Sequence, residues 1–136
     1  MGEPRVAVCL YDLTLWFLQR TNRFPKNYRV TLGDRVDRHV LEMLALVQKA
    51  SVRSNKTSLL RELNEGLNVL RALTRLCVDL GCLKGRQYEY ASRQIDEIGR
   101  QIGGWIKQQQ SRARMRREDE AEVGCVSTHH PERVTG

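Results

Sequence analysis

The chain contains few of the residues that interrupt helices. It has only three prolines and ten glycines in 136 residues, and few runs of β-branched residues. Because proline and glycine are unfavourable inside helices and β-branched residues favour strands, this composition predicts an all-α protein. A chain of 136 residues fits one domain, which at this size buries roughly 68 % of its unfolded surface and can form a real core.

The sequence also lacks the motifs of common active sites. It has no glycine-rich phosphate loop, no paired metal-ligand motif, and no serine or cysteine with an obvious base on the same element. The nearest carboxylates, Asp96 and Glu97, are adjacent, so they point in diverging directions on a helix and lack the histidine partners of di-iron bundles. We therefore expect no enzymatic activity, no metal ion and no cofactor.

Cysteine use indicates a reducing compartment. None of the four cysteines lies at the spacing of a metal-ligand pair: Cys9, Cys77, Cys82 and Cys125. Cys9 and Cys77 fall in apolar stretches, where a reduced thiol packs as a small apolar side chain. Cys125 could be grouped with His129 and His130, but their spacing matches no standard metal site. We expect reduced cysteines in a cytoplasmic protein.

No stretch of the sequence suits a membrane. The apolar run over residues 6–18 is shorter than the roughly 20 residues that a helix needs to cross a bilayer, and it contains Asp12. No small-residue cleavage site follows it. We therefore expect no membrane partner and no export.

The positive charge lies in the first part of the chain. Residues 1–110 carry 18 Lys and Arg against 11 Asp and Glu, which gives 18 − 11 = +7, whereas residues 111–136 carry five of each. Residues 111–136 also have little apolar content, so we divide the chain into a folded unit over 1–110 and a polar, disordered or frayed tail. A basic folded unit suggests an anionic partner, with nucleic acid first.

Apolar residues recur at intervals of three and four in four segments, which we expect to be helices: residues 6–21, 32–52, 58–80 and 88–107. Short corners join them, which predicts an up-down four-helix bundle with an apolar interior. For the third helix the predicted buried line is Leu59, Leu63, Gly66, Leu70, Leu73, Cys77 and Leu80. Gly81 then suits a left-handed helix end.

The first helix is apolar nearly all round. Its predicted seam is Val6, Leu10, Leu13 and Phe17, but four more large apolar residues lie off that seam: Tyr11, Leu15, Trp16 and Leu18. A helix of this kind needs cover on more than one side. The simplest cover is another subunit, so these four residues predict a homo-oligomer interface. The alternative is that the other three helices wrap the first one completely.

Residues 24–35 form the corner between the first two helices. Pro25 disfavours helical geometry at Phe24, and Thr31 offers a side-chain cap to the next helix. Four cations lie within or just before this corner, with Phe24 and Tyr28 between them: Arg20, Arg23, Lys26 and Arg29. Cations mixed with aromatic anchors can present charge to phosphate.

A second stripe, made of cations and amides without an acid, follows the third helix on the face away from its seam, at three-four spacing: Arg61, Asn64, Asn68, Arg71 and Arg75. The simpler interpretation is a solvated face, because Glu65 and Asp79 lie four residues after Arg61 and Arg75. Arg71, however, has no acid three or four residues away. Arg71 is therefore the cation most in need of an outside partner.

Two classes of function fit these features. The first is a basic oligomeric scaffold that binds nucleic acid through phosphate contacts, using the corner cations together with Arg61, Arg71 and Arg75. The second is a protein-interaction module whose cations meet an acidic protein.

Three parts of the sequence resemble a known family. They are the corner Phe-Pro-Lys-Asn-Tyr-Arg-Val-Thr-Leu-Gly-Asp-Arg over residues 24–35, Ala50, and Ile-Gly-Arg-Gln-Ile-Gly-Gly-Trp-Ile over residues 98–106. Together these resemble the accessory variability determinant proteins of diversity-generating retroelements over roughly residues 8–107. The Phe-Pro-Lys corner alone is shared with four-helix proteins encoded in ribosomal-RNA intervening sequences, but the residues that follow it favour the retroelement group.

The resemblance implies a homopentameric barrel of four-helix bundles with a basic surface. It implies a non-catalytic protein that associates with the element's reverse transcriptase and its template RNA or an RNA/DNA hybrid. Such a protein supports the error-prone complementary DNA synthesis of mutagenic retrohoming, which diversifies a target gene. The alternative is a protein-interaction scaffold of the intervening-sequence type with no nucleic-acid role.

Overall fold

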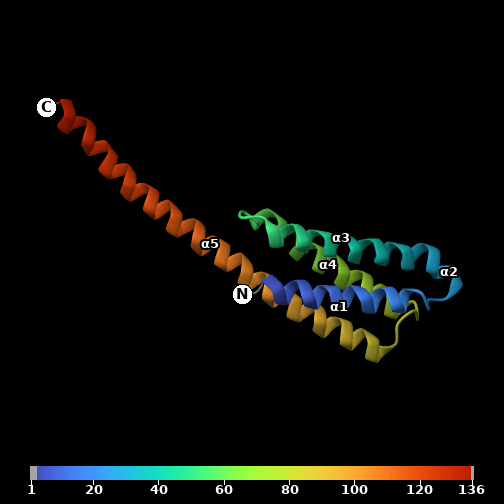
Figure 1. The fold of residues 1–136 in the computed structure, drawn as a ribbon. Helices are drawn as coiled ribbons and strands as arrows, with labels where there is room; N and C mark the ends of the chain where they lie inside the picture. Colours follow the sequence, from blue (N-terminus) through green and yellow to red (C-terminus); the bar gives the residue numbers. More distant parts are fainter. Residues whose placement is uncertain (1–2, 136) are drawn as a thin grey trace.

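A computed structural model describes the backbone of residues 3–135 and the side chains of residues 5–123. The described chain contains helices and no strand: α1 (Glu3–Thr21), α2 (Lys26–Tyr28), the π-helix η1 (Arg29–Gly33), α3 (Asp34–Val52), α4 (Thr57–Asp79) and α5 (Gly85–Thr135). Figure 1 shows the four long helices side by side, each running opposite to the one before it. The predicted all-α, up-down four-helix architecture is confirmed.

The four long helices close a ring around one apolar core. α1 packs against α3 and α5, and α4 packs against the same two helices. The predicted seam of α1 is buried throughout, from Val6 to Phe17. On α3 the buried apolar residues also recur at intervals of four and three: Val36, Val40, Met43, Val47 and Ala50. On α5 the buried residues recur at intervals of four and three: Ala91, Ile95, Ile98, Ile102, Trp105 and Gln109. Burial of these apolar faces is the main term that stabilises the bundle.

The predicted buried line of α4 is partly wrong. The buried residues are Leu60, Leu63, Leu67, Leu70, Thr74 and Cys77, whereas Leu59 and Leu73 are half-buried and Leu80 is exposed. Periodicity alone could not separate the two lines, because α4 carries apolar residues at both. Thr74 tolerates burial because its hydroxyl donates to the carbonyl of Leu70 at 2.6 Å.

The corner after α1 is helical, which the sequence did not predict. Pro25 does follow the end of α1 and is the N-cap residue of α2, but the chain then continues through η1 directly into α3. Thr31 therefore does not cap α3; its hydroxyl lies 3.5 Å from the carbonyl of Tyr28, and the backbone N–H of Asp34 donates to the Arg29 carbonyl. This wider turn buries Leu32 and Gly33 against the bundle.

Gly81 ends α4 in the way that the sequence predicts. Its φ is +78°, and its N–H donates to the Val78 carbonyl at 3.1 Å, while the N–H of Cys82 donates to the Cys77 carbonyl at 2.8 Å. This pair of hydrogen bonds defines a Schellman motif. The short corner that follows turns the chain back into α5 at the same end of the bundle as α2 (Figure 1).

Helix α5 continues beyond the bundle, into the segment for which the sequence predicts a disordered or frayed tail. It spans 51 residues, and Figure 1 shows its second half projecting from the end where the N-terminus lies. Burial stops at Gln109, and beyond it Ala113 is half-buried while the other described side chains to Val123 are exposed. The segment is rich in Arg, Ala, Gln and Glu, which favour helix without packing. Cys125, His129 and His130 lie outside the residues whose side chains are described.

Glycine substitutions should separate two backbone roles. A Cβ added at Gly104 in α5, or at Gly81, would meet no atom within 4 Å. Gly104→Ala should therefore stabilise the fold by about 0.5 to 1 kcal/mol, because alanine is the better helix former. Gly81→Ala should destabilise it by about 1 kcal/mol, because only glycine adopts a positive φ without strain. Urea unfolding followed by circular dichroism measures both changes. If the two substitutions change the free energy of unfolding in the same direction, this account is wrong.

The buried thiol of Cys77 should make stability depend on pH in the alkaline range. Burial, assisted by the neighbouring Cys82, raises the pKa of Cys77 from 9.0 to about 12. The folded state therefore favours the protonated thiol, and this stabilisation is complete below pH 9.0 and is lost as the pH rises toward 12. Urea midpoints measured from pH 8 to pH 11 should fall less steeply in Cys77→Ala than in the unchanged chain. If the urea midpoints of the two proteins fall equally with pH, Cys77 is not the source of the pH dependence.

Candidate nucleic-acid interface

The corner cations gather at the end of the bundle that carries α2. Arg20 is half-buried at the end of α1, where its guanidinium lies 5.3 Å from the ring centroid of Trp16. Its Nε is buried without a hydrogen-bond acceptor. Arg23 and Lys26 are exposed beside it. Stacking on Trp16 holds the Arg20 charge in place without neutralising it.

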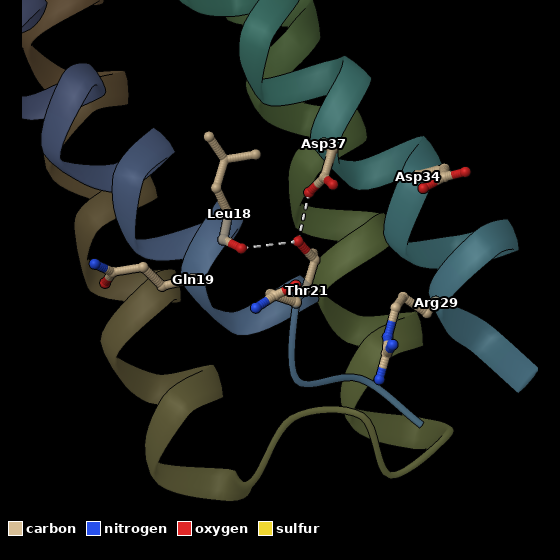
Figure 2. A pocket seen from close by; sticks show the side chains of 7 residues that line it. Leu18, Gln19, Thr21, Arg29, Asp34 and Asp37 are labelled. Carbon is tan, nitrogen blue, oxygen red and sulfur yellow. Dashed lines mark hydrogen bonds between the residues drawn. The ribbon is translucent and has the colours of Figure 1, made fainter. Parts of the chain in front are cut away.

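Arg29 lies in different surroundings from the other corner cations. Its guanidinium donates to the carbonyl of Phe24 at 3.4 Å, and it lines a cavity of about 410 Å³ together with Asp34 and Asp37. Figure 2 shows Thr21 reaching across this cavity, where its hydroxyl donates to Asp37 at 2.5 Å. Two carboxylates beside Arg29 make this cavity unfavourable for phosphate, so we expect a structural role for Arg29.

Arg20 and Arg23 instead line a basic cavity that includes a residue the sequence did not indicate. This cavity has a volume of about 440 Å³ and is lined by Arg20, Arg23, Pro25, Gly81, Cys82, Lys84 and Gln87. Lys84 comes from the corner between α4 and α5, which the fold places beside the end of α1. No carboxylate lines it. Only the antiparallel topology could reveal this cation, since it lies far from Arg20 in the sequence.

The cation stripe on α4 is more neutralised than the sequence predicts. Arg71 is not without an acid, because its guanidinium pairs with Asp96 of α5 at 3.0 Å and also donates to Asn68 at 2.9 Å. Arg75 pairs with Asp79 at 3.4 Å. Within the described chain Arg61 makes no ion pair. These exposed pairs are worth little energy and can exchange partners with phosphate.

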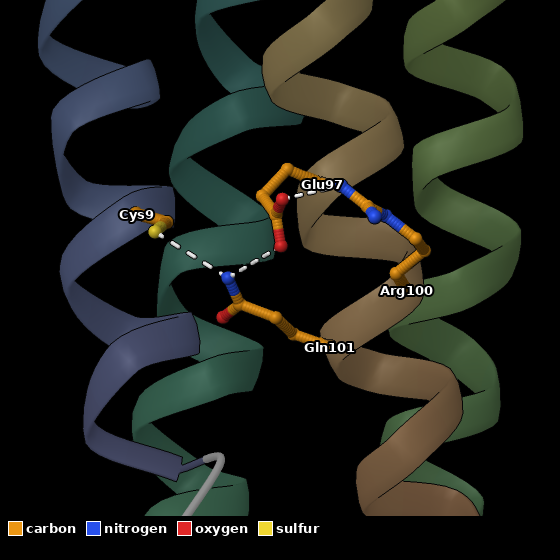
Figure 3. A network of polar contacts seen from close by, with 4 residues as sticks. All are labelled: Cys9, Glu97, Arg100 and Gln101. Carbon is orange, nitrogen blue, oxygen red and sulfur yellow. Dashed lines mark hydrogen bonds and ion pairs between the residues drawn. The ribbon is translucent and has the colours of Figure 1, made fainter.

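The adjacent carboxylates of α5 are used in separate ion pairs. Asp96 meets Arg71 on one side, while Glu97 pairs with Arg100 and accepts from the Gln101 side chain at 3.2 Å on the other. Figure 3 shows this network, in which Gln101 also reaches the thiol of Cys9 on α1. The two carboxylates therefore do not converge. No group of three or more His, Cys, Asp or Glu within the described residues could hold a metal ion.

The apolar face of α1 is only partly covered in the single chain. Tyr11 and Leu15 are exposed at 56 % and 46 %, and Val8 continues the same stripe. Trp16 and Leu18 are half-buried, Trp16 by edge contact with Phe17 and by Tyr90 of α5 at 5.2 Å. The other helices therefore do not wrap α1 completely, and an apolar stripe remains open to a partner.

Comparison with known proteins connects this architecture to one family. A family model described as bAvd-like matches residues 6–109, which is more than half of the chain. No curated protein matches the chain. The matched range ends where burial ends on α5, so the projecting part of that helix falls outside it. Across the described residues, no helix combines the length and apolarity that crossing a membrane requires.

Proposed function

The chain belongs to the bAvd-like family of accessory variability determinants, and we propose that it acts as a non-catalytic accessory protein of a diversity-generating retroelement. In this role it binds the element's reverse transcriptase and the template RNA or RNA/DNA hybrid. It thereby supports mutagenic complementary DNA synthesis. The family as a whole is generally non-catalytic.

The observation that carries this proposal is the placement of positive charge on the bundle. The net charge of +7 resides in residues 1–110, and three cations converge on a cavity without a carboxylate at one end of the bundle. Nucleic-acid phosphate is the polyanion that such a surface attracts, with an affinity that depends strongly on salt.

Assembly into a homo-oligomer, with the homopentamer expected from the family, forms the second part of the proposal. Tyr11 and Leu15 lie on the face of α1 opposite its buried seam. Burial of their exposed apolar surface by a second copy of the chain would stabilise the assembly. Repetition of the bundle would also repeat its cations. Several weak phosphate contacts per chain then add up along one nucleic-acid strand.

Replacing the α4 arginines tests their part in binding. Arg71→Ala with Arg75→Ala should leave the helical content and the oligomer intact and weaken association with RNA or with the polymerase roughly tenfold at low salt. Asp79→Asn with Asp96→Asn removes the acids that pair with them and should strengthen association instead. Fluorescence anisotropy with a labelled RNA measures both variants.

The matched control for this experiment removes two exposed cations of α3, in Arg38→Ala with Lys49→Ala. It loses the same charge away from α4. If all the variants bind RNA and polymerase as the unchanged chain does, the α4 stripe is a solvated face. The intervening-sequence type of scaffold then becomes the better description.

A charge placed on the exposed apolar stripe of α1 should dissociate the oligomer into subunits. Leu15→Glu puts a carboxylate in the proposed interface, where burying it without a partner costs several kcal/mol. Leu41→Glu on α3 is the control, because Leu41 is exposed to 47 %, nearly the same as Leu15 at 46 %. Native mass spectrometry should show subunits for Leu15→Glu and the assembly for Leu41→Glu. An intact assembly in both variants would move the interface elsewhere.

A further inference from the structure

We propose that the basic cavity between the end of α1 and the α4–α5 corner is a phosphate subsite, which holds one phosphate group of the bound nucleic-acid strand. The cavity is the one lined by Arg20, Arg23 and Lys84. The inference deepens the proposed function and rests on it for the source of the phosphate. The chemistry of the cavity itself is argued from its side chains.

Three cations from separate parts of the chain converge on this cavity. Arg20 lies in the last turn of α1, Arg23 follows the helix, and Lys84 immediately precedes α5. The volume of about 440 Å³ is many times the roughly 30 Å³ that one water molecule occupies, so a tetrahedral oxyanion fits with part of its hydration shell. Convergent cations around a compact anion give short, charge-assisted hydrogen bonds.

The lining of this cavity contains no carboxylate, which distinguishes it from four other cavities of the described chain. Four other cavities of the described chain each contain at least one carboxylate: Asp34 and Asp37 in one, Asp96 in another, Asp96 and Glu97 in a third, and Glu118, Asp119 and Glu122 in the last. The charge of Arg71 is paired with that of Asp96. Arg20, Arg23 and Lys84 make no ion pair within the described residues, so their charge is available to an outside anion.

Arg20 is held ready for such an anion. Its guanidinium is fixed over Trp16, which in turn contacts Phe17 of the core. A side chain that is already ordered loses little entropy when it binds a ligand. Its buried Nε has no hydrogen-bond acceptor among the described residues, so this N–H is left unsatisfied by the chain.

The opposite wall of the cavity is also rigid. The Schellman turn at Gly81 fixes the corner, and the side chain of Gln87 accepts a hydrogen bond from the backbone N–H of Lys84 at 2.8 Å. The first turn of α5 therefore lines the cavity through Gln87. Two exposed cations, Lys26 and Arg86, flank the lining residues in the sequence. They could meet the next phosphates of a strand.

Inorganic phosphate tests the subsite without any nucleic acid. The probe is phosphate added to the full chain at constant ionic strength against chloride, and the readout is the Arg20 Nε–H signal in nitrogen-15 NMR spectra. We expect a saturable shift of this signal and of the Gln87 side-chain amide. Arg23→Gln with Lys84→Gln should abolish the shift, and Arg38→Gln with Lys49→Gln on α3 should preserve it.

A short single-stranded RNA then tests whether the phosphate belongs to a strand. Each phosphate contact contributes about 0.7 to the slope of log affinity against log salt, so losing the one phosphate held by Arg23 and Lys84 should reduce the slope by about 0.7. The α3 control loses the same charge and should keep most of its slope. Circular dichroism and the mass of the native particle establish that each variant still folds and assembles.

The outcomes separate this inference from the proposed function. If phosphate produces no saturable shift, or if both double variants lose the same RNA slope, the subsite is wrong while RNA binding by the bundle stands. If the unchanged chain binds no RNA at all, the proposed function fails, and with it the strand as the source of phosphate. A poly-glutamate peptide that needs Arg23 and Lys84 as strongly as RNA does would reassign the cavity to an acidic protein.

Discussion

Burial of one apolar face from each of four helices is the constraint on which the rest of this molecule depends. Each long helix buries one apolar line: the seams of α1, α3 and α5, and the line from Leu60 to Cys77 on α4. Because short corners join the helices, these lines are buried together in an antiparallel ring. That ring brings the end of α1 beside the corner between α4 and α5. Residues that are distant in the sequence, such as Arg20 and Lys84, thereby line one cavity. The basic cavity is thus a consequence of how the core closes.

Most of the fold could be predicted because helical periodicity is a local property. The seams of α1 and α3, the stop at Pro25 and the left-handed Gly81 all follow from residues within a turn or two of each other. The prediction was wrong where two solutions are locally equivalent. On α4 two apolar lines compete, and only contact with α3 and α5 selects Leu60, Leu67 and Thr74. At the corner, the π-helix that buries Gly33 depends on packing that no spacing rule describes.

The charges were harder to predict because a charge acts across space. Arg71 has no acid within a helical turn, yet Asp96, which is 25 residues away, pairs with it on the neighbouring helix. The sequence therefore overstated the availability of Arg71, and it missed Lys84 entirely. On the side of α4, carboxylates pair with Arg71 and Arg75. At the end of the bundle no carboxylate lines the basic cavity, so we propose phosphate binding there.

The two proposed roles of α1 are compatible because they use different faces of the same helix. Leu15 and Arg20 are five residues apart, which at about 100° per residue places them roughly 140° apart around the helix axis. The stripe of Val8, Tyr11 and Leu15 also lies nearer the N-terminal end of α1, whereas the cavity lies at its C-terminal end. A second copy that covers the stripe would leave the cavity open. Each subunit of an assembly would then present the same phosphate subsite, and the subsites would recur around it at the spacing of the subunits.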